Sequence, residues 1–220
     1  LVMDGTYFEN IQITKNITVA SYFLVDGDTS HINETIIDGG ADDGEDAPFK
    51  SCVLFRDTQT SPNTSNLIGF TLQNGWGTQV TEEVENPEGD IEYITYRMGG
   101  GVMVHHTYPK ITYNKIRNNG FVEGERGPGT RRGGGGGFNN DDDVEFDEDR
   151  NGDIPGYSNH TRDEEIVFSN NWFQSNYAST GITLSSNGYN ETIDLSNNRF
   201  DIFSSTDSTV SDYWVKLGEA

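Results

Sequence analysis

Short phrases of apolar and polar positions recur along the chain at a fixed spacing. In residues 168–173 an apolar residue is followed by an asparagine three positions later and by a second apolar residue two positions further on, and residues 195–200 repeat this order. Residues 111–116 carry the same phrase, and Asn171 and Asn198 lie 27 residues apart. A repeat of short β-type phrases at such a period predicts a solenoid, in which successive coils stack on one another.

The asparagine is the most informative residue of each phrase. Asparagine tolerates the left-handed backbone conformation, and its side-chain amide can satisfy backbone groups at a turn. If the coils stack in register, Asn114, Asn171 and Asn198 lie one above another. We therefore expect an asparagine ladder.

The first half of the chain reads as further short strands, with no helix. The expected buried positions of the first strands are Ile11, Ile13, Ile17 and Val19. Short β-branched or aromatic runs follow at 35–39 and 51–56, and residues 68–75 alternate apolar and polar positions. These runs are the length of strands and are bounded by turn residues.

Two stretches break the strand pattern, and we interpret them as insertions into one domain of residues 1–220. The first spans about residues 76–98 and is expected to form a hairpin closed by residues 86–89 (NPEG). The second spans about residues 120–165 and contains a glycine run at 133–137 and an acidic run at 141–153. Insertions in solenoids leave one face of the stack, where binding sites are commonly built.

With these phrases in this order, the sequence resembles the right-handed parallel β-helix proteins of the pectin-lyase-like type, a large secreted group found on microbial surfaces. The resemblance rests on residues 4–11, 35–39, 68–75, 99–104 and 109–116. It covers most of the chain outside the two acidic, glycine-rich insertions, and it implies an all-β fold, a right-handed parallel β-helix. The family includes lyases, hydrolases, adhesins and structural proteins, so the activity must be argued from sites.

The chain is strongly acidic. It has 36 acidic and 14 basic residues, which give a formal net charge of −22. This charge repels phosphate backbones and anionic lipids, so we expect no nucleic-acid or membrane partner and favour cations instead. No apolar run is long enough to span a membrane. The chain begins at Leu1 without a leader, as a processed protein or a fragment would, and we expect it to be secreted.

The acidic run contains a candidate calcium site. Its oxygen ligands, at positions 1, 3, 5 and 7 of a loop with glycine at position 6, are Asp147, Asp149, Asn151 and Asp153. Such a loop points its oxygens at one hard cation, which relieves the repulsion among the acids. Position 12 is a serine instead of glutamate, so the missing carboxylate would come from residues 163–165. A solvated acidic loop is the alternative, and residues 26–28 and 42–46 are weaker acidic clusters.

No set of residues makes a convincing catalytic site. A lyase of this kind needs a base beside calcium-binding acids, and a hydrolase needs paired carboxylates facing a groove. Asp42 and Asp43 lie in a loop, and the nearby arginines lie in a glycine-rich tract. His105 and His106 follow an apolar strand on which adjacent residues face opposite sides, so at least one should lie on the surface. Cys52 is the only cysteine and should be buried as a small hydrophobic residue.

Five Asn-X-Ser/Thr sequons mark candidate glycosylation sites. They are Asn16, Asn33, Asn63, Asn159 and Asn190. Asn16 is the weakest of the five, because the other four fall in turn-like contexts. All would be accessible to glycosylation in an extracellular protein.

Two classes of function are compatible with these patterns. The first is an extracellular structural module, stabilised by calcium, that joins copies of itself in a surface filament, adhesin stalk or surface layer. The second is a polysaccharide lyase or glycoside hydrolase that acts on acidic polysaccharide. The net charge favours the first, because it repels polyuronate unless many cations intervene. A sugar platform for the second would consist of Tyr93, Tyr96, Tyr108 and Tyr113.

The two ends of the chain are predicted to make the head-to-tail contact between copies. A stack of parallel strands exposes unpaired backbone groups at each terminal coil. The first residues enter directly as a strand, and residues 210–217 form an alternating strand-like tail. The apolar residues concerned are Leu1, Val2, Met3, Val210, Trp214 and Leu217. Strand addition between such ends does not close and propagates as a filament, whereas a tail that folds back along its own solenoid is the alternative.

Overall fold

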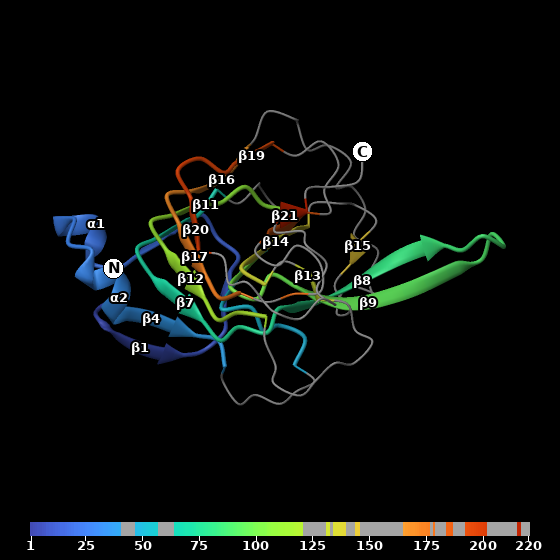
Figure 1. The fold of residues 1–220 in the computed structure, drawn as a ribbon, viewed down its shortest axis with the longest axis horizontal. Helices are drawn as coiled ribbons and strands as arrows, with labels where there is room; N and C mark the ends of the chain where they lie inside the picture. The colour runs from blue at the N-terminus through green and yellow to red at the C-terminus, as the bar shows by residue number, and fades with distance from the viewer. Residues whose placement is uncertain are drawn as a thin grey trace.

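The computed structural model describes residues 1–40, 47–56, 64–120, 131–132, 134–139, 144–145, 165–176, 178, 184–186, 192–201 and 215–216. Short β-strands dominate this part of the chain, and most of them pair in parallel (Figure 1). The prediction of a mainly β protein is confirmed, and the parallel sheets are compatible with an all-β parallel solenoid.

Three parallel sheets form the body of the protein. Sheet A contains, in spatial order, β1 (Gly5–Phe8), β4 (Thr35–Asp38), β7 (Thr71–Gln73), β12 (Lys115–Arg117), β17 (Trp172–Gln174) and β20 (Arg199–Asp201). Sheet B contains β2 (Ile11–Ile13), β5 (Val53–Arg56), β10 (Val102–His105), β14 (Gly136–Asn139), β18 (Leu184–Ser186) and β21 (Val215–Lys216). Sheet C contains β3 (Thr18–Ala20), β6 (Asn66–Ile68), β11 (Lys110–Thr112), β16 (Glu165–Ser169) and β19 (Thr192–Asp194). The chain passes repeatedly from one sheet to the next, so spatial order follows chain order within each sheet.

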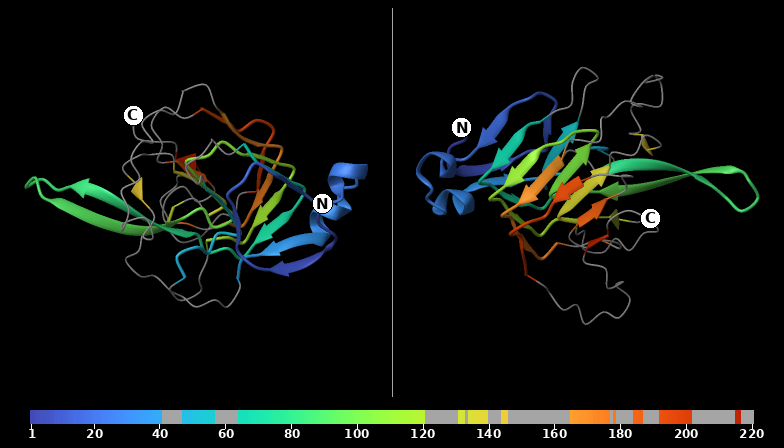
Figure 2. Two further views of the ribbon diagram at one scale, coloured as in Figure 1. Left: turned by 180° about the vertical axis from the view of Figure 1, so that it is seen from behind. Right: turned by 90° about the horizontal axis from the view of Figure 1, so that it is seen from above.

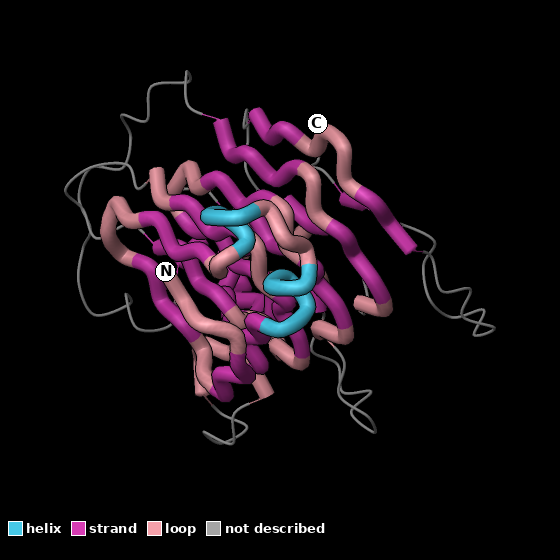
Figure 3. Tube along the Cα trace, turned by 90° about the vertical axis from the view of Figure 1, so that its left-hand side faces the viewer, coloured by secondary structure: helices cyan, strands magenta, loops and turns pink. Residues whose placement is uncertain are grey.

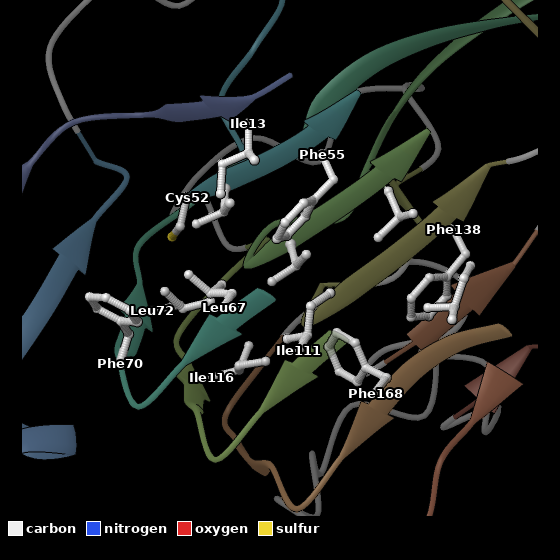
Figure 4. Packing of buried hydrophobic residues seen from close by; sticks show 14 of the residues in the cluster. Ile13, Cys52, Phe55, Leu67, Phe70, Leu72, Ile111, Ile116, Phe138 and Phe168 are labelled. Atoms are coloured by element: carbon white, nitrogen blue, oxygen red, sulfur yellow. The ribbon is translucent and has the colours of Figure 1, made fainter. Parts of the chain in front are cut away.

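The apolar residues of the repeated phrase lie one above another inside the stack. Ile111 pairs with Leu67 on one side and with Phe168 on the other, and Ile116 lies between its neighbours in the same way. These four side chains are 0% exposed. Figure 4 shows them in one continuous cluster. Since each fully buried side chain of this size contributes roughly 1.5–3 kcal/mol by leaving water, the interior of the stack stabilises the fold.

The predicted asparagine ladder is present at the turn from sheet C to sheet A. The Oδ1 atom of Asn171 accepts a hydrogen bond from the backbone N–H of Asn114 at 2.9 Å, and Oδ1 of Asn198 accepts one from the backbone N–H of Asn171 at 2.8 Å. The left-handed residue is the one before each ladder asparagine, with φ of 57° at Asn170 and 56° at Asn197. At these two turns, therefore, the first asparagine adopts the left-handed backbone, and the second one makes the side-chain amide hydrogen bonds.

A second asparagine ladder, which we did not predict, lies at the turn that leaves sheet A. The Oδ1 atom of Asn176 accepts from the backbone N–H of Asn119 at 3.1 Å, and Oδ1 of Asn119 accepts from the backbone N–H of Gly75 at 2.9 Å. Both asparagines are buried. They follow Asn114 and Asn171 by five residues, and this spacing is the signal that could have revealed the second ladder.

Two short helices between β3 and β4 show that the expectation of no helix in the first half of the chain was wrong. They are α1 (Phe23–Asp26) and α2 (Ser30–Glu34). Elements of four or five residues are too short to show the helical period, so the apolar pattern could not predict these helices. The helices lie against the turn from sheet C to sheet A, where the ring centroids of Phe23 and Tyr113 are 5.2 Å apart (Figure 3).

A long antiparallel hairpin leaves the body between β7 and β10 (Figure 2). It consists of β8 (Thr78–Glu85) and β9 (Ile91–Met98), which form sheet D with β13 (Arg131–Arg132) and β15 (Val144–Glu145). This is the hairpin predicted within residues 76–98. The Oδ1 atom of Asn86 accepts hydrogen bonds from the backbone N–H groups of Glu88 and Asp90 at 3.1 and 2.9 Å, so Asn86 organises the turn.

The base of the hairpin covers part of the outer face of sheet B. A second buried cluster joins Leu54 and Met103 of that sheet to Val80, Tyr96 and Met98 of the hairpin. All five side chains are at most 2% exposed. Over these residues the outer face of sheet B is apolar and closed to solvent.

Part of the glycine run of the second insertion packs against an earlier glycine-rich turn. The backbone N–H of Gly101 donates to the carbonyl oxygen of Gly134 at 3.0 Å. A Cβ atom on Gly100 would lie 2.5 Å from the same carbonyl oxygen, and one on Gly75 would collide with the carbonyl oxygen of Gly100. Successive coils approach too closely here for side chains, which explains the glycines on both sides of the contact.

The N-terminal residues differ from the predicted strand. Val2 forms only an isolated bridge with Ser21, and the first strand begins at Gly5. Leu1 and Met3 are 68% and 65% exposed. These two side chains therefore remain available on the surface of the described residues.

The described part of the C-terminal tail lies along its own stack. Strand β21 pairs in parallel with β18, and Val215 lies opposite Leu184. This is the arrangement that the sequence left open as the alternative to a free terminal strand. Val210, Trp214 and Leu217 lie outside the described residues.

Candidate functional site

The predicted calcium loop lies outside the described residues. Its four ligands are Asp147, Asp149, Asn151 and Asp153, and the site stays a prediction. Within the part of the chain that the structure describes, no group of three or more His, Cys, Asp or Glu side chains is arranged to hold a metal ion. The weaker cluster at 42–46 is also undescribed, and at 26–28 the carboxylates of Asp26 and Asp28 accept backbone N–H groups at 2.9 Å in local turns.

One histidine connects the N-terminal segment to both short helices. The Nδ1 atom of His31 lies 2.8 Å from Oδ1 of Asp4, and its Nε2 atom lies 3.2 Å from Oδ2 of Asp26. The Asp4 carboxylate also accepts the hydroxyl of Thr35 at 3.1 Å. The hydrogen bond to Asp4 is the largest cause that raises the pKa of His31, desolvation opposes it, and Asp26 adds to the increase. When protonated, His31 therefore ties together three separate segments.

His105 and His106 contradict the expectation that at least one of them lies on the surface. They are 6% and 7% exposed, and their ring centroids are 4.1 Å apart. Strand β10 ends at His105, and His106 has a φ of 49°, so the alternation of a strand no longer holds for the second ring. The left-handed residue brings together two side chains that a continued strand would separate.

Two of the five candidate glycosylation sites are described. Asn16 and Asn33 are both exposed, whereas the remaining three, Asn63, Asn159 and Asn190, lie outside the described residues. The Asn33 amide donates to the carbonyl oxygen of Thr29 at 3.2 Å and accepts from Nζ of Lys115 at 3.3 Å. Thr35 of the same sequon is buried, so its hydroxyl is hidden in the folded protein.

The four tyrosines considered as a sugar platform do not share a surface. Tyr96 of β9 is 2% exposed in the buried cluster between the hairpin base and sheet B, and Tyr108 packs against the main core. Tyr93 lies on the projecting hairpin, and Tyr113 contacts Phe23 beside the short helices. These residues therefore do not form the platform that the lyase alternative requires.

Cys52 is buried, as predicted. Its side chain is 0% exposed, and the thiol donates to the carbonyl oxygen of Gln73 at 3.1 Å. Burial raises the pKa of the Cys52 thiol to about 12. The thiol therefore stays protonated at neutral pH and packs as a small side chain.

Charged and aromatic side chains form a row on the outer face of sheet A. Lys115, Trp172 and Arg199 lie next to one another on β12, β17 and β20. Nζ of Lys115 and Cζ of Arg199 lie 4.4 and 4.7 Å from the Trp172 ring centroid. The indole Nε1 donates to Oδ2 of Asp201 at 2.9 Å. We did not predict this row. The sequence signal was that the residues flanking the second apolar position of each repeated phrase are charged, polar or aromatic, and strand alternation directs them outward.

The first coil presents three strand edges at one end of the stack. Strands β1, β2 and β3 are terminal in sheets A, B and C, and among the described residues the outer edges of β1 and β2 are open, whereas Val2 bridges Ser21 and donates its N–H to the carbonyl oxygen of Ala20 at the edge of β3. Val2, Ile11 and Val19 are partly buried against the main core at this end. Phe8 and Ile17 are 71% and 46% exposed. Unpaired backbone edges and apolar side chains thus lie together.

Comparisons with protein-family models, with curated proteins and with solved structures gave no match. In the described ranges, no helix is long and apolar enough to cross a membrane.

Proposed function

We propose that the chain is a right-handed parallel β-helix that serves as an extracellular structural module and stacks end to end with copies of itself in a filament, stalk or surface layer. The observation that carries this proposal is the pair of open parallel strand edges, β1 and β2, at the first coil, beside β3, whose edge Val2 covers in part. The repeated passage of the chain among three parallel sheets supports the closed helix. Calcium binding by the loop at 147–153 completes the proposal and stabilises the module.

Strand edges favour the addition of another strand. A buried N–H or C=O group without a partner costs about 1–3 kcal/mol, whereas a strand from a second copy satisfies it. The same contact would bury the parts of the Val2, Ile11 and Val19 side chains that are still exposed to solvent. Backbone pairing and apolar burial therefore act together at this end of the stack.

The opposite ends of the three sheets supply the complementary edge, formed by β19, β20 and β21. On β20, Phe200 is 37% exposed and stacks on Phe173 with ring centroids 5.0 Å apart. Continuing sheet A into β1 of the next copy would place Phe200 over Tyr7, because Tyr7 pairs with the inward residue Ile37. Since β21 already pairs within its own chain, the contact uses its outer edge rather than a free strand. Such a head-to-tail contact does not close, so it propagates.

No observation among the described residues favours the alternative of a lyase or hydrolase that acts on acidic polysaccharide. The four tyrosines are dispersed, and the hairpin base covers part of one sheet face. That alternative is tested with a panel of acidic and neutral polysaccharides, assayed for unsaturated or reducing ends. Turnover of any of them would contradict a purely structural role.

A proline in the edge strand β2 tests the proposed stacking. The backbone N–H of Ile11 donates to the carbonyl oxygen of Cys52, the residue before β5, at 3.0 Å, so the N–H of Gln12 points to the open edge. Gln12→Pro removes this outward donor and leaves the bonds to β5 in place. We expect electron micrographs to show end-to-end filaments for the wild-type protein and none for Gln12→Pro.

Two further variants control this experiment. Gln12→Ala keeps the donor and should assemble as the wild-type protein does. Deletion of residues 210–220 removes β21, which should abolish assembly. If folded Gln12→Pro, verified by its circular dichroism spectrum and melting temperature, forms end-to-end filaments as Gln12→Ala does, end-to-end stacking is wrong.

A further inference from the structure

Two cations lie side by side on the outer face of sheet A. Lys115 and Arg117 flank Ile116 on β12, and Ile116 is 0% exposed in the core, so the alternation of the strand directs both cations outward. Each is half-buried. Their position is fixed by the same register that stacks the repeated phrase.

Neither cation has a carboxylate partner among the described residues. The contacts of Lys115 are the amide oxygen of Asn33 at 3.3 Å and the ring of Trp172. Arg117 donates through Nε and Nη2 to the amide oxygen of Gln73 at 3.1 and 2.8 Å. By contrast, Arg199 on the same face pairs with Asp201 at 2.9 Å. In a chain with 36 acidic and 14 basic residues, an adjacent pair of cations without a carboxylate marks a local site for an anion.

The surroundings hold both cations in place. Desolvation is the largest cause that lowers the pKa of Lys115, and the neighbouring Arg117 lowers it further, as expected for two cations that share a partly desolvated surface. The ring of Trp172 contacts the Lys115 side chain, and the amide oxygen of Gln73 accepts hydrogen bonds from two nitrogens of Arg117. Because these side chains are already ordered, an anion that binds them loses less conformational freedom than it would on two flexible lysines.

The same chain carries an acidic projection on another part of its surface. The end of the β8–β9 hairpin, which we call the arm tip, comprises residues 86–94 and includes the exposed carboxylates Glu88, Asp90 and Glu92. Ile91 and Ile94 of the arm tip are 57% and 40% exposed. Figures 1 and 2 show the arm pointing away from the body on the side opposite to the strands of sheet A. One copy therefore cannot bring its own arm tip onto its own Lys115 and Arg117.

We propose that the outer face of sheet A binds the arm tip of a second copy of this chain, with Lys115 and Arg117 receiving its carboxylates. Charge complementarity selects this occupant, because the arm tip is acidic and this face carries two cations that have no carboxylate partner within the described part of the chain. The exposed isoleucines of the arm tip add apolar area to the contact. Donor and acceptor surfaces lie on opposite sides, so the contact is heterologous and links copies side by side. It does not involve the strand edges of the end-to-end contact, so the two contacts can be separated experimentally.

Charge reversal in one partner and then in both tests the proposal, by sedimentation velocity over a range of protein concentration and salt. All proteins carry Gln12→Pro, which removes end-to-end stacking. We expect the parent to associate with increasing concentration and to dissociate at high salt. The face variant, Lys115→Glu with Arg117→Glu, should be monomeric, and so should the arm variant, Glu88→Lys with Asp90→Lys and Glu92→Lys.

Mixing the two variants restores an acidic partner for each basic one, so the mixture should associate again. The matched control, Lys15→Glu with Lys110→Glu, reverses two exposed lysines away from sheet A and should associate as the parent does. The proposal is overturned if the parent is monomeric at every concentration, if the face variant associates as the parent does, or if the mixed variants stay monomeric. Binding of polyglutamate or an oligogalacturonate to Lys115 and Arg117 in a parent that does not associate would show that the face takes a different anion.

Discussion

Removing the amide of Asn171 should destabilise the protein more than removing any exposed asparagine. Asn171 is 1% exposed, and its Oδ1 atom accepts from the backbone N–H of Asn114 at 2.9 Å and from the side-chain amide of Asn114 at 3.2 Å. Its Nδ2 atom donates to the carbonyl oxygen of Ile111 at 2.8 Å. In Asn171→Ala all three contacts are lost in a buried turn.

The expected magnitude follows from the groups that lose a partner. The side-chain amide of Asn114 keeps Leu67 and Thr112 as acceptors, both at 3.1 Å, so its loss is minor. The backbone N–H of Asn114 and the carbonyl of Ile111 lose their Asn171 partner, at about 1–3 kcal/mol each. We therefore expect Asn171→Ala to lower the free energy of unfolding by about 2–6 kcal/mol, a large part of the stability of a typical domain.

Equilibrium denaturation in urea measures this loss as a shift of the midpoint at constant slope. The matched control is Asn66→Ala, which removes one exposed hydrogen bond to Thr18 and should change the free energy of unfolding by no more than about 0.5 kcal/mol. Asn198→Ala, at the partly buried last rung, should lie between the two. If Asn171→Ala costs no more than Asn66→Ala, the ladder does not stabilise the stack and the reasoning is refuted.

Three further predictions concern the glycine contact, His31 and the cation. Gly100→Ala should lower the free energy of unfolding by about 1–3 kcal/mol or more, since its Cβ would lie 2.5 Å from the carbonyl oxygen of Gly134, and an unchanged urea midpoint would contradict this. The pKa of His31 is raised in the folded protein by Asp4 and Asp26. The stability that His31 contributes is therefore complete below its ordinary pKa of 6.5 and is lost as the pH rises through the folded pKa. The difference in melting temperature between wild type and His31→Ala should accordingly shrink from pH 5.5 to pH 9. Asp28, which also faces this group, has a lowered pKa because Ser30 donates hydrogen bonds to it, so it stays ionised throughout that range. Chelation of calcium should lower the melting temperature and increase hydrogen exchange near residues 140–160, Asp149→Ala should reproduce the loss, and identical melting and exchange with and without chelator would remove the calcium site.

Features encoded within a few neighbouring residues could be predicted from the sequence. The phrase of residues 111–116 identified a buried apolar pair and a ladder asparagine, because a short strand and its turn are set by adjacent positions. The hairpin and the buried Cys52 were also predicted correctly, from turn residues and from apolar neighbours. The short helices were not, because α1 and α2 are shorter than the pattern that identifies a helix.

Short β-strands with asparagines at their turns could be predicted from the residues alone, since alternation and turn propensity are local properties. Which residues meet across coils could not, because that depends on the register between strands far apart in the chain. Register places Asn119 on Asn176, 57 residues away, and sets Lys115 beside the ring of Trp172. A single left-handed residue, His106, likewise brings together two rings that strand alternation would separate. Contacts of this kind join residues on different coils, so they cannot be predicted before the register of the coils is known.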